Sequence, residues 1–528
     1  MKNKKSVLIN TLIFAAIVIF INLVSLSIFY RMDFSKGKIY SLSKASKTAV
    51  RNLDDRMVIK AYFTKNLPGE LASAQRFTKD ILSDYQAYSR GKLRFEFIDP
   101  ASAEDLKKEA QQNGISPFNM RVVQNDKLEI REVYLGLSFM YQGKSEVIPI
   151  VQNTQGLEYD ITSMIKKITA KGLKKVAFFE QEGAELDPML ARQGITSFYQ
   201  SARQLLSGNY ELKDTDLNTP IDVAVEVLIF TGIEDSLSSE QLFNLDQFIM
   251  KGGNVLAFQE KVTTVLQEQR AETINSNLFD LLKHYGITIK NNIVKDANCG
   301  SIQIQRRQGF FNIATPVNYP FMPMINKFSK ENLITKNLDT AVLYFASEID
   351  TTKVGAGLSC ESLLVTSSNS GETRGPRFDI NVQPFMNADL KTMLLDDPKT
   401  VSAIFTGTFK TYFGNDQAHP DALLESSSAK FLLVSDSDFI KEGSGASVQA
   451  NNMDFFLNSV DYLASESTLI EIRSRETEHK PLKELKNGPR KFVKWLNILL
   501  PSLLLILVGF IRYRRELQNR KHIGELYE

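Results

Sequence analysis

Two acidic pairs carry the side chains whose types and spacing could do chemistry. Glu182 and Glu185 lie in a loop after a predicted strand, where two carboxylates could serve as general acid and general base. Asp436 and Asp438 follow a second predicted strand, where carboxylates can hold Mg²⁺. Each pair also has a plainer interpretation: the first is a solvated turn, and in the second one aspartate caps a helical turn. The plainer interpretation is favoured for both, and no third carboxylate or phosphate-binding lysine accompanies the aspartates.

Other reactive side chains lack the partners that catalysis or metal binding requires. The predicted strand at residues 254–258 runs into Gln259 and Glu260, with no serine or cysteine at the turn. His419 has no evident nucleophile partner, and none of the four histidines has another histidine or a cysteine at metal-ligand spacing. The chain contains no Walker loop, no Gly-x-Gly-x-x-Gly and no Gly-x-Ser-x-Gly. The sequence therefore predicts no catalytic residue, no cofactor and no metal site.

An aromatic, proline-rich segment at residues 310–328 is a further candidate for contacts. It has neither helical nor strand periodicity, and it contains Phe310, Phe311 and Phe321. Such a segment either caps the core of its own domain or forms an exposed apolar patch for a protein partner. These three aromatics and the four acidic residues above make up the candidate ligand or partner surface.

The elements that must position these residues form two successive α/β patterns. The first, at residues 32–172, has an order of elements compatible with a thioredoxin-like layer. It contains no Cys-x-x-Cys, so dithiol redox chemistry is unsupported. Its predicted strands are residues 58–64, 93–97, 133–141 and 145–151, and its predicted helices are residues 71–90 and 158–170.

The second pattern, at residues 173–472, predicts a larger flavodoxin- or amidotransferase-like α/β domain with an irregular insertion at about residues 260–400. Apolar runs such as residues 225–230 are typical of central strands in a parallel sheet covered on both faces. Open α/β sheets bind ligands at the carboxyl ends of their strands, which is where both acidic pairs lie. The predicted strands are residues 176–179, 211–214, 223–230, 254–258, 401–405 and 431–435, and the predicted helices are residues 196–206, 238–250 and 452–463.

Uncharged, mostly apolar runs at residues 6–30 and 495–511 predict one transmembrane helix near each end of the chain. The first run is too long for a signal-peptide core and lacks a small-x-small site, which favours an uncleaved anchor at residues 1–31. A charged tether at residues 473–491 and a helix with a basic cytoplasmic tail at residues 492–528 complete the expected plan. The basic amino end favours both termini in the cytoplasm and the body on the periplasmic side.

Composition narrows the function classes. The chain has 528 residues and a formal net charge of +2, so nothing indicates nucleic-acid binding. With 43% hydrophobic residues, it can bury the cores of two or three domains. Cys299 and Cys360 lie far apart in sequence, which leaves a disulfide and two buried thiols both open.

Several motifs resemble those of the gliding-motility-associated ABC-transporter auxiliary family, the GldG-like proteins. The most specific is DFSKGKIYSLS at residues 33–43, which is similar to the family's Y-S-L-S signature. The sequence NLFDLLKHYGI at residues 277–287 resembles its L-L-x-x-Y-G-I helix. The segments at residues 406–413, 436–439 and 452–458 are similar to its later motifs.

One loop departs from the family pattern. Residues 181–185 read QEGAE, where relatives tend towards Gly-x-Gly-Glu. The resemblance otherwise extends from the first apolar run to the last, and the family offers no established catalytic residues to carry over.

The resemblance implies an auxiliary subunit that works with a multi-span ABC permease and a cytoplasmic ATPase at the bacterial inner membrane. In gliding Bacteroidetes such complexes are linked to surface motility and its secretion machinery. We therefore expect a non-catalytic, extracytoplasmic binding or coupling subunit, with the membrane and an envelope component as further contacts. A membrane-tethered envelope hydrolase and a mechanical scaffold of a motility or secretion assembly are the alternatives.

Overall fold

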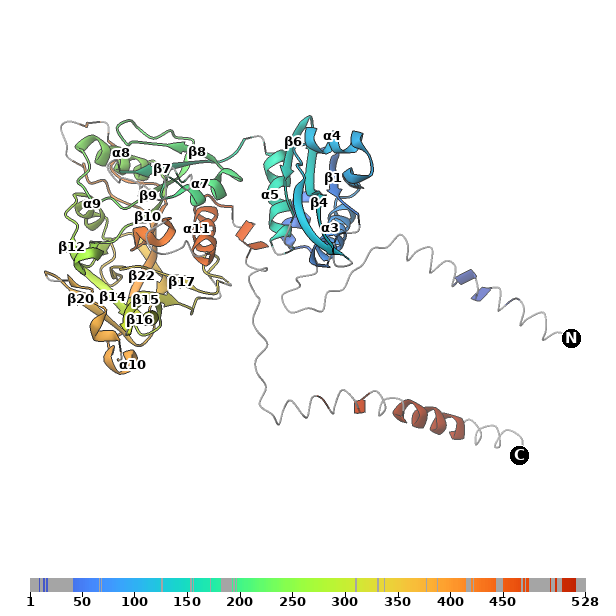
Figure 1. The fold of residues 1–528 in the computed structure, drawn as a ribbon. Coiled ribbons are helices and arrows are strands. Elements are labelled where there is room, and N and C mark those ends of the chain that lie inside the picture. The colour runs from blue at the N-terminus through green and yellow to red at the C-terminus, as the bar shows by residue number, and fades with distance from the viewer. Residues whose placement is uncertain are drawn as a thin grey trace. The chain divides into compact units, whose positions relative to one another are not determined.

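The computed structural model describes most of the chain between residues 41 and 473. Residues Met1–Glu478 form one compact unit and residues His479–Glu528 a second. All elements named below belong to the first unit (Figure 1). The described residues are 41–181 and 197–473, with gaps at 66, 68, 125–126, 152–153, 155, 171, 309–310, 330–331, 337, 377, 387, 415–418, 421, 443–449, 467–468 and 471, together with residues 9, 13, 14, 16, 17, 192, 195, 494, 499, 500 and 506–518.

The expectation of two transmembrane helices requires correction. Among the residues just given, no helix is long and apolar enough to cross a membrane. Most of residues 6–30 and 495–505 lie outside the described residues. The expected α/β class of the body is confirmed.

The amino-terminal layer comprises, in chain order, α2 (Lys44–Arg51), β1 (Met57–Phe63), α3 (Gly69–Tyr88), β2 (Leu93–Ile98), η1 (Pro100–Ser102), α4 (Glu104–Gln112), β3 (Phe118–Gln124), β4 (Lys127–Val133), β5 (Leu135–Tyr141), β6 (Lys144–Ile148) and α5 (Leu157–Thr169). Its main sheet has the order β2-β1-β5-β6. β1 runs parallel to β2 and antiparallel to β5, which forms a hairpin with β6. Leu82 and Tyr85 of α3 and Ile161 and Ile165 of α5 repeat at helical spacing, and they pack with the strands in one core.

The β3–β4 hairpin is an addition that the sequence patterns did not predict. The two strands pair with each other outside the main sheet. The strand expected at residues 133–141 is divided, because β4 ends at Val133 and β5 begins at Leu135.

The carboxyl-terminal domain is built on a seven-stranded sheet of β7 (Lys175–Glu180), β8 (Glu211–Asp214), β9 (Val225–Thr231), β10 (Asn254–Phe258), β19 (Leu358–Val365), β22 (Thr400–Gly407) and β23 (Ala429–Val434). The order is β19-β22-β23-β10-β9-β7-β8. β8, β7, β9, β10 and β23 run parallel, and β22 and β19 extend the sheet in antiparallel fashion. Along the chain, the parallel strands have the flavodoxin-like order 2-1-3-4-5.

Helices cover both faces of this sheet (Figure 1). They are α7 (Gln200–Ser207), α8 (Ser239–Met250), α9 (Leu278–His284) and α11 (Ala450–Leu463). Because side chains alternate across a strand, Phe178 and Ile229 pack in the core that contains α7 and α11. Phe179 and Phe230 pack in the opposite core, with α8 and α9. Continuous apolar strands are thus explained by burial on both faces.

The stretch expected to be irregular has a β-structure of its own. Its elements are β11 (Val262–Val265), η2 (Leu266–Glu268), β12 (Arg270–Thr273), β13 (Thr288–Ile289), β14 (Asn292–Asp296), β15 (Cys299–Gln308), β16 (Phe311–Ile325), β17 (Ala341–Val342), β18 (Ile349–Asp350), β20 (Ser370–Arg374), β21 (Phe378–Asp379), η3 (Gln383–Phe385) and α10 (Leu390–Met393). Contrary to expectation, the aromatic segment at residues 310–328 is largely a strand, because β16 pairs antiparallel with β15 from Gln308↔Phe311 to Cys299↔Pro323.

Candidate functional site

The carboxyl ends of the parallel strands are the first place to look for a site. From β7 the chain moves outward to β8 and then returns across β7 to form β9, so the strand order reverses between β7 and β9. In open α/β sheets, ligands bind outside the carboxyl ends of the strands at such a switch point. Here the strand ends supply Glu180 from β7, Thr231 from β9, Glu260 just after β10 and Asp436 just after β23.

Asp436 is a structural cap. One of its oxygens accepts a hydrogen bond from the Asp438 backbone N–H at 2.9 Å, which caps η4 (Ser437–Ile440). The other accepts from the Tyr344 backbone N–H at 2.7 Å. Burial and the neighbouring Asp438 raise the pKa of Asp436 well above its ordinary value. Among the described residues, no group of three or more His, Cys, Asp or Glu side chains could hold a metal ion.

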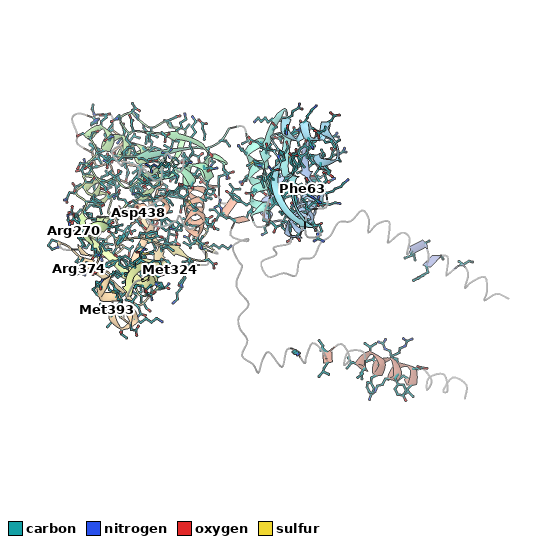
Figure 2. The ribbon with its side chains drawn as sticks, viewed as in Figure 1. Phe63, Arg270, Met324, Arg374, Met393 and Asp438 are labelled. Atoms are coloured by element: carbon teal, nitrogen blue, oxygen red, sulfur yellow. The ribbon has the colours of Figure 1, made fainter. Side chains whose placement is uncertain are left out.

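Asp438, which is labelled in Figure 2, lies in η4, directly after the carboxyl end of β23. Its carboxylate is 3.3 Å from the Lys441 ammonium, and the side chain retains 27% of its exposure. The structure therefore brings both aspartates of the predicted pair to the carboxyl ends, where Asp436 caps η4 and Asp438 pairs with Lys441.

Glu260 is a buried carboxylate that the sequence did not single out. Its two oxygens accept from the Ser437 backbone N–H at 2.6 Å and from the Ser437 hydroxyl at 2.8 Å. Burial, and then the nearby Asp438, raise the pKa of Glu260 to about 7. In the sequence, Glu260 is an acidic residue two positions after an apolar strand. This pattern does not distinguish a buried carboxylate from an exposed one.

Gln259 joins the ends of β9 and β10. Its side-chain oxygen accepts from the Ile233 backbone N–H at 2.7 Å, and its side-chain nitrogen donates to the Ile233 carbonyl at 3.1 Å. Gly232 has φ +54°, and a Cβ built there would lie 3.3 Å from the Ser437 Cβ, so the two loops approach closely. The side chains of Gln259, Glu260 and Asp436 thus bind polar groups of the loops that follow β9 and β23.

The switch point itself has one polar group that is less well satisfied. The Thr231 hydroxyl is buried, and within the described part of the chain it has no hydrogen-bond partner. The Tyr199 hydroxyl lies close to it, and burial, with help from Asp438, Glu260 and Glu180, raises the pKa of Tyr199. Glu180 is engaged by Arg203, which donates to it at 2.6 and 3.0 Å.

The remaining predicted site residues are not assembled here. Glu182, Glu185 and Phe310 lie outside the described residues, and Phe311 belongs to β16. Phe321 is only 1% exposed and packs against Tyr319, Phe345 and Phe385. Phe321 is therefore a core residue of the insertion and not part of an exposed patch.

A surface groove of about 330 Å³ is lined by residues of α8, among them Phe243 and Phe248, and by residues from His419 to Leu423. His419 stacks on Phe243 in this groove, with ring centroids 3.7 Å apart. The groove residues include Ile221, Phe248 and Leu423, and next to them in sequence Val223 and Leu424 are 83% and 62% exposed. Exposed apolar side chains around a groove are typical of protein contact surfaces.

Two of the family-like motifs meet at a buried carboxylate. Asp246 of α8 accepts from the Tyr285 hydroxyl at 2.8 Å, from the Thr411 hydroxyl at 2.6 Å and from the Tyr412 backbone N–H at 2.8 Å. Tyr285 belongs to the motif at residues 277–287 and Thr411 to the motif at residues 406–413. The role of these motifs visible in the structure is to hold α9 and the 411–412 turn against α8.

Comparison with known proteins identifies a family whose model matches this chain. Residues 173–459, more than half of the chain, match the model of a family described as an ABC-type uncharacterized transport system. Residues 36–140 match a domain of unknown function. An uncharacterized protein of Borreliella burgdorferi is 24% identical over 531 residues, which cover 98% of this chain and 99% of that protein.

Solved structures give weaker likenesses. The mmIFT52 N-terminal domain is 13% identical, with a TM-score of 0.31, over 54% of this chain and 96% of that chain. A ThuA-like protein from Bacteroides uniformis is 12% identical, with a TM-score of 0.29, over 56% of this chain and 94% of that chain. TM-scores this low carry no argument about fold or function.

Proposed function

This chain belongs to the family described as an ABC-type uncharacterized transport system, and on that premise we propose that it is a non-catalytic auxiliary subunit of an ABC transport complex. In this proposal the chain is the binding or coupling subunit of the complex. A permease subunit forms the transport path, and a separate cytoplasmic ATPase hydrolyses ATP. The observation that carries the proposal is the extent of the family match, since residues 173–459 contain the whole parallel sheet and its carboxyl ends.

The bonding of the buried carboxylates supports a non-catalytic role. A general acid or base must reach a proton of the substrate. Glu260 directs both oxygens to Ser437, and Asp436 directs its oxygens to the backbone N–H groups of Tyr344 and Asp438. These carboxylates hold loops together at the position where a related enzyme would present its reactive groups.

The groove beside α8 is the surface that we assign to a partner subunit. The groove contains the stacked rings of Phe243 and His419. Val223 and Leu424, which lie within two residues of the lining residues Ile221 and Leu423 in sequence, are exposed beside it. Aromatic and apolar side chains that lose water on contact supply most of the affinity of protein interfaces.

The finer assignment is to a gliding-motility-associated complex at the bacterial inner membrane, with the body on the periplasmic side. Its support is the resemblance of the motifs at residues 33–43 and 277–287 to that family. The side of the membrane is tested by replacing Cys299 and Cys360 with serine, adding Leu395→Cys at a position that is 76% exposed and outside the proposed partner surface, and labelling spheroplasts with a membrane-impermeant maleimide. Labelling only after the membrane is permeabilised would contradict the periplasmic placement.

The subunit proposal is tested by purifying the tagged full chain in mild detergent and identifying the proteins that accompany it. We expect a permease and an ATPase in a fixed ratio to the chain. Recovery of the chain alone, folded and intact, would overturn the proposal.

An envelope hydrolase is the second candidate, favoured by one observation. The pKa of Glu260, at about 7, lies where a general acid or base is effective. The substitution Glu260→Gln separates the two functions: cellular function lost with the complex intact would favour the hydrolase, and function retained would favour the auxiliary subunit.

A further inference from the structure

Both ends of the folded unit are held at the beginning of one helix. At the amino-terminal end, the Glu158 carboxylate of α5 accepts from the Ser43 backbone N–H at 2.7 Å and from the Ser46 hydroxyl at 2.6 Å. Ser43 also caps α2 by accepting from the Ser46 backbone N–H. Glu158 is 7% exposed, so these bonds form away from water. The last residues of the Y-S-L-S motif are thus fixed to α5.

At the carboxyl-terminal end, Arg473 is fixed to the next residue of the same helix. Its guanidinium donates to the Tyr159 hydroxyl at 2.6 Å and lies 4.5 Å from the centre of the Tyr159 ring. Ala45 of α2 forms an apolar cluster with Leu469 and Ile472, and Tyr159 packs against this cluster. Ser43 and Arg473, which lie near the two ends of the described part of this unit, therefore bind neighbouring residues of α5.

Arg473 also binds the large domain. It donates to the Asp461 carboxylate of α11 at 3.0 Å and to the side-chain oxygen of Asn458. The other Asp461 oxygen accepts from the Tyr210 hydroxyl at 2.7 Å. Arg473 and Asp461 are 7% and 1% exposed, so removing either leaves a buried charge without its partner. A single side chain near the carboxyl-terminal end of the unit thus bridges α5 and α11.

The connection between the two domains is short and lies beside open space. The chain passes from α5, which ends at Thr169, to β7, which begins at Lys175. A cavity of about 260 Å³ next to this connection is lined by residues of both domains, among them Gly172, Tyr210 and Leu469. One ion pair, between Lys166 of the first domain and Glu466 of the second, joins the two sides of this cavity at a distance of 2.8 Å. A short connection, a cavity and a few polar bonds are the features of a hinge that one contact can hold closed.

We propose that Tyr159, Asp461 and Arg473 form a latch that fixes the two domains relative to each other only while the segment ending at Arg473 is seated. Displacing this segment removes the guanidinium from both domains at once. Because Glu158 and Tyr159 are adjacent, the same displacement acts beside the point where the amino-terminal end is held. The latch is a property of this chain itself and so goes beyond the proposed transport function.

The test measures the distance between the domains in the full-length chain. Spin labels are placed on Lys79→Cys in the first domain and Leu395→Cys in the second, in a Cys299→Ser, Cys360→Ser background; Leu395 is 76% exposed. With the latch intact we expect one narrow distance distribution from double electron–electron resonance. Arg473→Ala should at least double its width or add a second population, and Tyr159→Phe, which removes one hydroxyl, should give an intermediate width.

The control is Arg203→Ala, which breaks ion pairs to Glu180 and Asp214 within the large domain only. It should leave the distribution unchanged. If Arg473→Ala does not fold, Tyr159→Phe is compared with Asn209→Ala, because the Asn209 side chain also donates to the Tyr159 hydroxyl at 3.0 Å; the latch requires the broader distribution in Tyr159→Phe. The proposal is overturned if Tyr159→Phe keeps the narrow distribution, or if Arg203→Ala broadens the distribution to the same extent.

Discussion

Glu260 shows how a residue at a catalytic position in the fold can serve the fold instead. It follows β10 at the carboxyl edge of the sheet, next to the switch point at which similar folds bind ligands. Its oxygens are occupied by Ser437, and Ser437 in turn lies against Gly232. The carboxylate therefore joins the loops after β9, β10 and β23, at the cost of burying a group that ionises in water.

This burial makes stability depend on pH. Burial, followed by Asp438, raises the pKa of Glu260 from 4.5 to about 7. Between these values the folded chain binds more protons than the unfolded chain, so the contribution of this group is full below the unfolded pKa and is lost as the pH rises through 7. We expect Glu260→Gln to raise the free energy of unfolding at about pH 8 by about 1–3 kcal/mol and to change it little at about pH 4.5.

Denaturant unfolding of the two proteins at both pH values measures the effect. Glu425→Gln is the matched control, because the Glu425 side chain is exposed and its replacement should leave the pH dependence unchanged. An unaltered pH dependence in the Glu260→Gln protein would show that Glu260 ionises normally in the fold.

At the scale of elements, the buried Asp246 carboxylate joins three segments that are distant in sequence. We expect Tyr285→Phe to lower the free energy of unfolding by about 1–3 kcal/mol, because it removes one donor from a buried carboxylate. Tyr412→Phe is the control, since Tyr412 contributes only its backbone N–H to Asp246; it should cost about 0.5 kcal/mol or less. Equal losses in the two variants would exclude the bond as the cause.

The turn that follows α9 depends on a glycine. Gly286 has φ +79°, and a Cβ built on it would lie 2.2 Å from the Gly355 backbone nitrogen. Gly143, in the β5–β6 turn, also has φ +79° but has nothing within 4 Å of such a Cβ. We expect Gly286→Ala to lower the free energy of unfolding by about 3 kcal/mol or more, and Gly143→Ala by only about 1 kcal/mol. Thermal or denaturant unfolding of both variants separates the clash from the backbone strain that they share.

The elements also show what a sequence can predict. β8 and β10 have the predicted bounds, and α8 begins one residue after the predicted start at residue 238, because Ser238 caps it through reciprocal bonds with Gln241. Local patterns define such elements. β15 and β16 were missed because Pro316, Pro320 and Pro323 argue against a strand. β16 accommodates them because, beyond its pairing with β15, its other edge pairs with β17 only at Met324 and Ile325.

Long-range pairing explains the rest of what was missed. β12 pairs with β21 and β14 with β20 across long stretches of chain, and no local pattern records such partners. The same limit applies to the site. The sequence placed Asp436 and Asp438 after a strand, but the bonds from Tyr344 and Ser437 that determine the roles of Asp436 and Glu260 come from other segments.

At the scale of the whole molecule, the groove beside α8 predicts where a partner subunit binds. Val223→Glu and Leu424→Glu place a charge at side chains that are 83% and 62% exposed. We expect each to reduce the recovery of permease and ATPase with the tagged chain about tenfold, which corresponds to about 1.4 kcal/mol of binding. Leu395→Glu, at a side chain of the insertion that is 76% exposed, should not change the recovery. Normal recovery with both groove variants would place the contact elsewhere.

The position of the insertion has a consequence for how relatives can diverge. β10 ends at Phe258 and β22 begins at Thr400. The two strands nevertheless lie close together in the same sheet, where only β23 separates them. Near its ends, the Ser347 hydroxyl accepts from Lys261, and the Thr366 backbone N–H donates to the Lys399 carbonyl. The insertion leaves the sheet after β10 and returns to it at β22, so the parts of it that lie outside the sheet can change in length without displacing the parallel strands. Among homologues, we expect insertions and deletions between residues 262 and 399 to avoid α9 and β19, because α9 covers the sheet and β19 belongs to it.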